Sequence, residues 1–148
     1  MDAGNYDKTP SEQINLNELL AERIKIFEPK FSGKITFEPD DKESLQNLPK
    51  RDFLQVLNIL LDNATKYGEK KIVVTLKDHK ITVANDGAVV RAEDREKIFD
   101  RFYQTDKTKD GSGLGLSIAK TICEQNGWRI ECSSQGKMTE FTLGWALL

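Results

Sequence analysis

The sequence predicts an α/β fold: a two-layer sandwich in which a mixed sheet of about five strands is covered on one face by three helices. Two observations predict it. Amphipathic helical segments alternate with groups of short apolar strands, and most of the strands occur as closely spaced pairs typical of antiparallel hairpins. The composition agrees, because 148 residues with 38% hydrophobic and 31% charged side chains suit one globular core.

The N-terminal part of the chain contains a linker, a helix and a strand. Residues 1–13 are polar and are assigned to a linker or cloning remnant, which leaves 14–148 as the domain. Residues 15–27 place leucine, isoleucine and phenylalanine three or four positions apart, which predicts a helix. Residues 35–38 form a short apolar stretch that Pro39 ends, so we expect a strand there.

The rest of the chain repeats this alternation. One arc of residues 50–67 is apolar and Gly68 follows it, which predicts a long helix with a glycine stop. A short helix is predicted over 93–99 and a third long helix over 113–126. Two hairpins complete the sheet; they pair 71–76 with 80–84, and 128–133 with 138–145.

Charge and composition argue against several classes of function. The net charge is -2, so nothing indicates a basic surface for nucleic acid. No apolar run reaches the roughly 18 residues that cross a bilayer. Cys123 and Cys132 lack a C-x-x-C spacing, which favours buried free thiols over a metal site. The single histidine, His79, falls in a predicted hairpin turn.

One flank of the second helix carries groups that suit a phosphate ligand. Asn63, Lys66 and Tyr67 are three and four residues apart, so they share an arc beside the apolar face. An amide, an ammonium and an aromatic ring could together hold a metal-bound phosphate and a flat base. The alternative is an ordinary solvated flank with Tyr67 half-buried.

Two glycine-containing segments are further candidates. A strand ends near Asn85, and Gly87 after it permits positive φ or close backbone approach, although a plain turn also explains this segment. Residues 111–120, GSGLGLSIAK, open a helix with three alternating glycines whose free N–H groups can bind an anion. This loop is neither a Walker A nor a Rossmann motif, and the alternative is a flexible surface loop.

The segment between these candidates supplies a cation. Apolar residues anchor residues 98–102 to the core, so Arg101 projects from a fixed base and could reach phosphate oxygens. The polar, lysine-bearing stretch 105–110 is typical of a mobile lid, although simple solvation explains its lysines as well.

Taken in order, these segments resemble the sequence boxes of sensor histidine kinases. Residues 58–67 resemble the N box, 85–88 the G1 box, 98–103 the F box, and 111–116 the G2 box. The resemblance covers about residues 14–146 of the chain. It implies the Bergerat fold that gyrase and Hsp90-type ATPases share, with ATP between the helices and a lid and with Mg²⁺ on its phosphates.

The resemblance also implies roles for individual residues. Asn63 would hold Mg²⁺, Lys66 would contact phosphate during catalysis, and Arg101 would meet the γ-phosphate during transfer. Tyr67, Asn85, Gly87 and Thr139 would surround the adenine. A loop would cradle the phosphates with its backbone N–H groups; its residues are Gly111, Gly113, Leu114, Gly115 and Leu116.

The chain departs from the family at three positions. Ile59 stands where the family has a further asparagine, Asn85 stands where it has an aspartate, and Val89 replaces a glycine. Because Asp86 follows Asn85, either residue could contact adenine. An asparagine amide can present its oxygen or its NH₂, so we expect weaker rejection of GTP than with aspartate.

The resemblance implies a kinase domain that binds Mg-ATP and donates its γ-phosphate to a histidine on a separate dimerisation and phosphoacceptor domain, with a response regulator acting downstream. It implies a monomeric cytoplasmic fragment of a homodimeric kinase anchored in the bacterial inner membrane. Because His79 is not on a predicted helix, we expect no self-phosphorylation. The alternatives are a nucleotide sensor without transfer, an ATP-driven clamp, and a serine kinase of the anti-sigma type.

Overall fold

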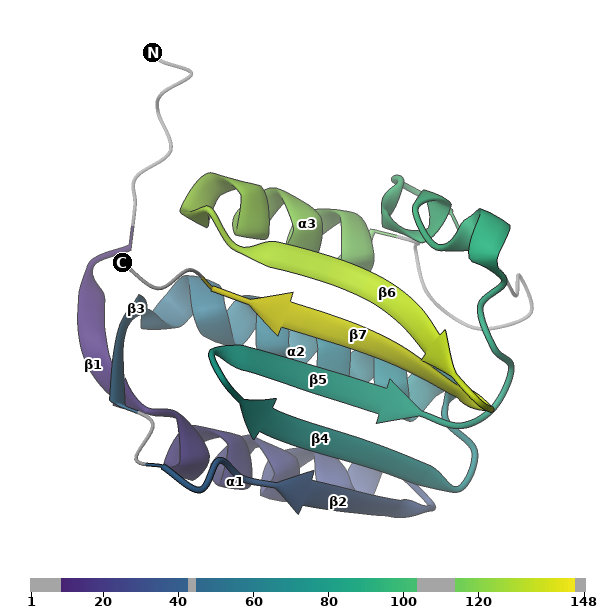
Figure 1. The fold of residues 1–148 in the computed structure, drawn as a ribbon, viewed down its shortest axis with the longest axis horizontal. Coiled ribbons are helices and arrows are strands. Elements are labelled where there is room, and N and C mark those ends of the chain that lie inside the picture. Colours follow the sequence, from purple (N-terminus) through teal and green to yellow (C-terminus); the bar gives the residue numbers. More distant parts are fainter. Residues whose placement is uncertain (1–8, 43–44, 104–113, 146–148) are drawn as a thin grey trace.

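The computed structural model describes residues 9–42, 45–103 and 114–145, and its main feature is a five-stranded sheet with helices on one face (Figure 1). The strand order is β2 (Lys34–Glu38), β4 (Lys71–Lys77), β5 (Lys80–Asn85), β7 (Met138–Gly144) and β6 (Arg129–Gln135). Only the β2–β4 pair is parallel among these neighbours, so the sheet is mixed, as predicted.

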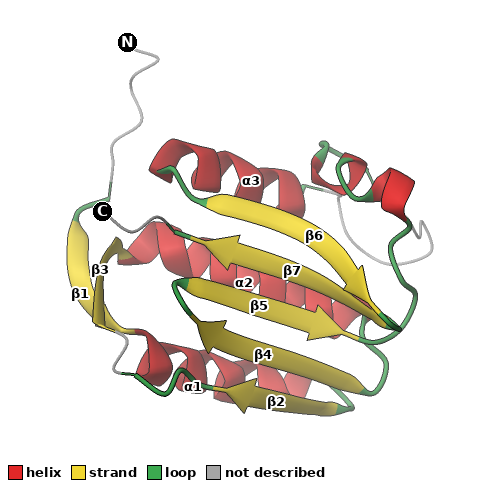
Figure 2. Cartoon of the chain, in the orientation of Figure 1, coloured by secondary structure: helices red, strands yellow, loops and turns green. Residues whose placement is uncertain are grey.

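Three helices lie behind this sheet in Figure 2, and they complete the predicted two-layer sandwich. They are α1 (Leu16–Phe27), α2 (Lys50–Tyr67) and α3 (Gly115–Asn126). The side chain of Asn15 accepts a hydrogen bond from the Glu18 N–H, so Asn15 caps α1 rather than belonging to it. Gly127 ends α3 with a φ of 72°, a left-handed conformation that glycine adopts without strain.

The core lies between α2 and the sheet. The apolar arc of α2 is buried against the central strands; its fully buried members include Phe53, Val56, Leu57, Leu60 and Leu61. The Phe53 ring packs edge-on against Trp128 and Trp145, with ring centroids 5.8 and 5.5 Å apart. The core therefore fixes α2, and with it the polar flank that lies beside the buried arc.

A second sheet was not predicted from the sequence. β1 (Ser11–Asn15) pairs antiparallel with β3 (Leu45–Pro49), and β1 begins inside the segment 1–13 that the sequence analysis assigned to a linker. Each strand buries one apolar side chain, Ile14 in β1 and Leu48 in β3. One buried residue per strand leaves no alternating pattern for sequence analysis to detect.

The prediction of one short helix over 93–99 was wrong. The chain there forms two short 3-10 helices, η2 (Ala92–Asp94) and η3 (Lys97–Phe99). Their hydrogen bonds span three residues, as in the bond from the Asp100 N–H to the Lys97 carbonyl at 2.9 Å. A further 3-10 helix, η1 (Glu28–Lys30), extends α1. None of the helices in the described ranges combines the length and apolarity that crossing a bilayer requires.

Candidate active site

A cavity of about 520 Å³ brings together five of the predicted site residues. They come from four separate parts of the chain: Asn63 and Tyr67 from α2, Asn85 from the end of β5, Leu116 from α3, and Thr139 from β7. The sheet register explains part of this convergence, because Asn85 and Thr139 are directly paired across β5 and β7. The volume lies in the range of small-molecule sites.

The polar flank of α2 forms one side of the cavity. Asn63 and Tyr67 line it and are half-buried. Lys66 lies beside Tyr67, with its ammonium 5.3 Å from the ring centroid, and does not itself line the cavity. The predicted arc is therefore present, but two of its three residues face the cavity directly.

Asn85 and Asp86 have different surroundings. Asn85 is only 2% exposed and lines the cavity, whereas the Asp86 carboxylate accepts hydrogen bonds from the backbone N–H groups of Glu69, Lys70 and Lys71 at 2.8 to 3.2 Å. Desolvation acts to raise the pKa of Asp86, but these N–H donors outweigh it and lower the pKa below its ordinary value. The geometry leaves Asn85 as the residue of this pair that faces the cavity.

The Asn85 amide is held in one orientation. Its Nδ2 donates to the backbone carbonyl of Asp86 at 2.6 Å, contrary to the expectation that it could present either end. Gly87 supports this turn from outside the cavity, with a φ of 103°. A Cβ added at Gly87 would lie 2.5 Å from the carbonyl oxygen of Tyr67, so the turn requires glycine there.

Thr139 uses its hydroxyl to hold the loop that follows β5. The Oγ1 atom accepts from the Val90 N–H at 3.2 Å and lies 3.5 Å from the Ala88 carbonyl oxygen, to which it can donate. Val89, which replaces the family's glycine, lines the cavity on this same loop. Thr139 is thus a buried wall residue that also positions the loop.

Sequence analysis missed four polar residues that line the cavity: Glu69, Arg91, Asp94 and Tyr103. Asp94 is buried, and it accepts from the Tyr103 hydroxyl at 2.6 Å and from Arg91 Nε at 3.3 Å. The Tyr103 hydrogen bond, joined by Arg91, holds the pKa of Asp94 below its ordinary value against the opposing effect of burial. Tyr103 lies in the predicted F box, whereas Asp94 ends the short 3-10 helix η2, where the sequence gave no sign of a buried carboxylate.

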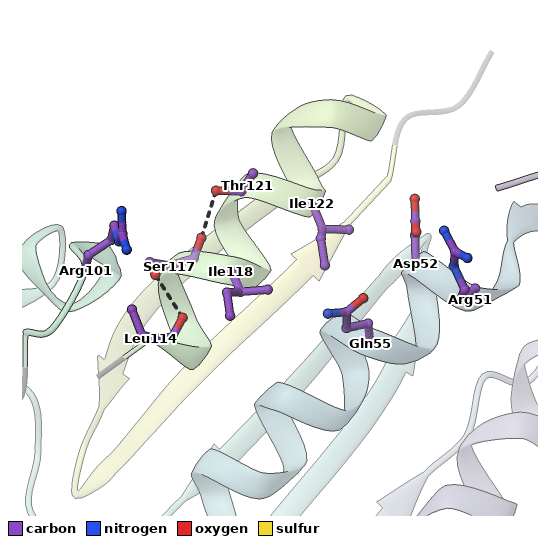
Figure 3. A pocket seen from close by; sticks show the side chains of 9 residues that line it. All are labelled: Arg51, Asp52, Gln55, Arg101, Leu114, Ser117, Ile118, Thr121 and Ile122. Atoms are coloured by element: carbon purple, nitrogen blue, oxygen red, sulfur yellow. Dashed lines mark hydrogen bonds between the residues drawn. The ribbon is translucent and has the colours of Figure 1, made fainter. Parts of the chain in front are cut away.

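Arg101 and Leu114 line a second cavity of about 450 Å³ between the start of α2 and α3 (Figure 3). Arg101 is exposed, with its guanidinium carbon 5.3 Å from the centroid of the Phe102 ring. In Figure 3, Arg101 and Leu114 lie at one end of this cavity, and Arg51, Asp52 and Gln55 lie on α2. The structure therefore does not bring Arg101 into the first cavity.

The start of α3 separates the two cavities. Leu116 lines the first cavity and Leu114 the second. The first hydrogen bond of α3 runs from the Ile118 N–H to the Leu114 carbonyl at 2.9 Å, so the N–H groups just before Ile118 have no partner within the helix. Gly111, Gly113 and the predicted lid 105–110 lie outside the described residues.

The departure at Ile59 on α2, and its neighbour Asn58, have clear structural consequences. Asn58 points to α1, where its Oδ1 accepts from Arg23 Nε and Nη2 at 3.2 and 2.9 Å. Ile59 packs against the core, and a Cβ added at Gly115 would lie 3.6 Å from its Cγ2. Asn58 therefore cannot replace the missing amide, and Ile59 instead supports the start of α3.

The histidine and the cysteines lie outside the cavity. His79 occupies the β4–β5 turn with a φ of 65°, at the opposite end of β5 from Asn85, and its Nε2 is 3.1 Å from Gln46 Nε2. Both cysteines are free; burial raises the pKa of Cys123 to about 12 and that of Cys132 to about 11. Within the described ranges, no group of three or more His, Cys, Asp or Glu could hold a metal.

Known proteins with similar sequences are sensor kinases. "Signal transduction histidine-protein kinase ArlS" from Staphylococcus epidermidis is 33% identical over 99% of this chain and 35% of its own length. "Sensor histidine kinase YkoH" from Bacillus subtilis is 34% identical over 76% of this chain and 27% of its own length. The chain thus spans about a third or less of the curated relatives it matches.

Solved structures with the same fold are histidine kinase domains. The catalytic domain of ThkA has a TM-score of 0.73 and 30% identity, over 90% of this chain and 93% of that one. Full-length ShkA in complex with AMPPNP has a TM-score of 0.80 at 23% identity, over 90% of this chain and 30% of that one, which shows the shared fold. A family model described as "Histidine kinase-, DNA gyrase B-, and HSP90-like ATPase" matches residues 49–147. The chain therefore belongs to this ATPase family, and within it to the catalytic domains of two-component sensor histidine kinases.

Proposed function

We propose that the first cavity binds Mg-ATP and that the domain donates the γ-phosphate to a histidine on a separate dimerisation and phosphoacceptor domain. The observation that carries this proposal is the convergence of Asn63, Tyr67, Asn85 and Thr139 on one cavity of about 520 Å³. Membership of the family supports it, and full-length ShkA, which shares the fold, was solved with AMPPNP.

The buried end of the cavity suits the adenine base. Asn85 offers a polar group there, and Thr139 closes the wall beside it. Ile98 and Phe141 supply apolar surface to the same cavity, which a flat base can pack against. Tyr67 adds an aromatic ring on the α2 side.

The phosphates would lie toward the start of α3. The N–H groups of Gly115, Leu116 and Ser117 precede the first helical hydrogen bond, so they and the helix dipole favour an anion. Gly111 and Gly113 would extend this cradle. Lys66, beside Tyr67 on α2, would contact a phosphate with its flexible ammonium.

Asn63 suits the proposed Mg²⁺. It lines the cavity, and an amide oxygen is a ligand that Mg²⁺ accepts. The ion commonly keeps several waters and binds substrate phosphates, so one protein ligand together with ATP oxygens is a workable set. When bound, Mg²⁺ would neutralise phosphate charge that builds up during transfer. Ile59 leaves Asn63 as the single amide of the N box on this face.

Transfer needs partners outside this chain. Phosphoryl transfer depends on positioning and charge stabilisation, and Arg101, which lines the second cavity, would act on the γ-phosphate from the acceptor side. We propose that the acceptor domain belongs to the same homodimeric kinase, that a response regulator follows, and that the isolated domain is monomeric. Because ATP is the donor, we place the domain in the cytoplasm, with the parent kinase anchored in the membrane.

Nucleotide binding with two matched variants tests the first half of this proposal. Asn63→Ala and Asn58→Ala remove the same amide from the same helix, but Asn58 bonds Arg23 on α1 and Asn63 lines the cavity. Calorimetry should show Mg-ATP binding by the parent and Asn58→Ala, and loss of the Mg²⁺-dependent part in Asn63→Ala. No binding to the parent at millimolar nucleotide would rule out the proposal.

Labelling from γ-labelled ATP tests the second half. The domain alone should remain unlabelled, because His79 lies in a strand turn at the far end of β5 from the cavity. Addition of the cognate acceptor domain should produce labelled acceptor, and Arg101→Ala should slow this transfer while nucleotide affinity is kept. Label on the isolated domain that disappears in His79→Gln would contradict the assignment. Binding without transfer to any acceptor would favour a nucleotide sensor instead.

A further inference from the structure

We propose that Asp86 fixes the orientation of the Asn85 amide and thereby makes the buried end of the cavity selective for adenine over guanine. This inference rests on the proposed function, because it requires a nucleotide in the cavity. Asn85 would contact the base, and Asp86 is a positioning residue that acts through Asn85.

The contact between the two residues defines which end of the amide faces the cavity. The Asn85 atom that lies 2.6 Å from the Asp86 carbonyl oxygen must be the NH₂ nitrogen, because two oxygens at that distance would repel each other. The Oδ1 atom is on the other branch of the same planar amide. Since Asn85 lines the cavity and is otherwise buried, Oδ1 is the part of the amide offered to a ligand.

Asp86 is held firmly enough to serve as the fixed partner. Its carboxylate accepts from three consecutive backbone N–H groups, those of Glu69, Lys70 and Lys71. Its own N–H donates to the Lys71 carbonyl at 3.2 Å. The residue is therefore tied at the side chain and at the backbone to the segment that follows α2, and its carbonyl is directed at Asn85.

The other buried polar side chains of the described cavity wall are already engaged. Both carboxylate oxygens of Asp94 accept hydrogen bonds, from Tyr103 and from Arg91. Thr139 accepts from the Val90 N–H and faces a carbonyl. Asn85 Oδ1 is thus the acceptor that the buried wall presents to a base.

An acceptor at this position distinguishes the purines. The 6-amino group of adenine donates a hydrogen bond, whereas guanine carries a carbonyl oxygen at the same place. For guanine to bind in the same pose, the amide must turn over, which loses the bond to Asp86 and brings two oxygens together. Each of these two losses corresponds to about a fivefold change in affinity, so we expect ATP to be preferred over GTP by roughly 30-fold.

Affinities for Mg-ATP and Mg-GTP in a set of variants test the inference. Asp86→Ala should lower the ATP-to-GTP ratio by about tenfold, and Asp86→Asn, which keeps one acceptor oxygen, should lower it less. Asn85→Ala should abolish the preference, and adding Asp86→Ala to it should change the ratio no further. Asp41→Ala, which removes an exposed carboxylate, is the control and should leave the ratio unchanged. Circular dichroism and thermal unfolding would establish that each variant is folded.

A second measurement, of hydrogen exchange at the Asn85 side chain, requires neither a bound nucleotide nor a folded Asp86→Ala variant. In the parent, the NMR signals of the Asn85 NH₂ group, assigned with Asn85→Ala, should exchange slowly with solvent, and Asp86→Asn should accelerate that exchange. Equal affinities for ATP and GTP in the parent would overturn the inference while leaving ATP binding intact. The same holds if neither the ATP-to-GTP affinity ratio nor the exchange rate of the Asn85 NH₂ group changes when Asp86 is substituted. Failure of the parent to bind either nucleotide would overturn the proposed function and this inference with it.

Discussion

Replacing Gly87 by alanine should be one of the most damaging single-methyl additions in this domain. Gly87 has a φ of 103°, which alanine adopts with strain, and an added Cβ would lie 2.5 Å from the carbonyl oxygen of Tyr67. That oxygen belongs to the last turn of α2 and cannot rotate away as a side chain could. The substitution therefore combines a backbone penalty with a collision.

The magnitude follows from adding these two effects. A non-glycine residue at positive φ costs about 1–2 kcal/mol, and forcing an extra carbon into an occupied space costs about 1–3 kcal/mol. We expect Gly87→Ala to lower the free energy of unfolding by about 2–5 kcal/mol. Displacing the Tyr67 carbonyl would also move a wall of the first cavity, so nucleotide affinity should fall.

Gly136→Ala provides the matched control. Gly136 also has positive φ, 60°, but an added Cβ there meets nothing within 4 Å. It should cost only the backbone penalty of about 1–2 kcal/mol and leave nucleotide affinity unchanged. Urea unfolding followed by circular dichroism gives both free energies. Equal losses in the two variants would refute the reasoning, because they would show that the Tyr67 carbonyl does not confine Gly87.

Three further predictions concern contacts outside the cavity. In a double-mutant cycle, Arg23→Ala and Asn58→Ala should couple by about 1 kcal/mol in unfolding free energy, because their hydrogen bonds join α1 to α2; additive effects would contradict this. Because the pKa values of the thiols are raised to about 12 in Cys123 and about 11 in Cys132, iodoacetamide at pH 8 should label the native protein slowly and the urea-unfolded protein quickly, as mass spectrometry can show. Asp86 has a lowered pKa in the folded state, so its stabilising effect should be complete above its ordinary pKa near 3.8 and disappear as the pH falls through the lower folded value. The stability difference between the parent and Asp86→Asn should therefore be constant near pH 6 and shrink below about pH 4 in denaturation experiments.

The sequence predicted the elements whose apolar pattern is long and regular. The bounds of α2 agree with the prediction, because its buried apolar arc runs from Phe53 to Ala64 and Gly68 follows the helix directly. The β1–β3 sheet was missed, since Ile14 and Leu48 are its buried apolar side chains and no periodicity forms. Here pairing between distant strands, rather than a local pattern, produces the structure.

For the site, the spacing of residues along one helix could be read from the sequence, whereas hydrogen bonds between separate elements could not. Asn63 and Tyr67 are separated by one helical turn, and both line the cavity; their roles toward a nucleotide stay predictions. The bond between Tyr103 and Asp94 could not be read from the sequence, because it joins the short 3-10 helix η2 to a loop residue nine positions later. The single orientation of Asn85 was likewise unpredictable, since it depends on how the segment after α2 holds Asp86.

The division of the predicted residues between two cavities bears on how transfer would occur. Leu116 faces the cavity assigned to ATP, and Leu114, two positions earlier, faces the cavity that contains Arg101. A nucleotide whose phosphates rest on the N–H groups at the start of α3 would therefore end close to Leu114, which lines the second cavity. On the proposed function, Arg101 would then approach the γ-phosphate from the second cavity, which it lines. On this reasoning, substitution of Arg101 should affect the transfer step and not the binding step, which is the separation that the labelling experiment measures.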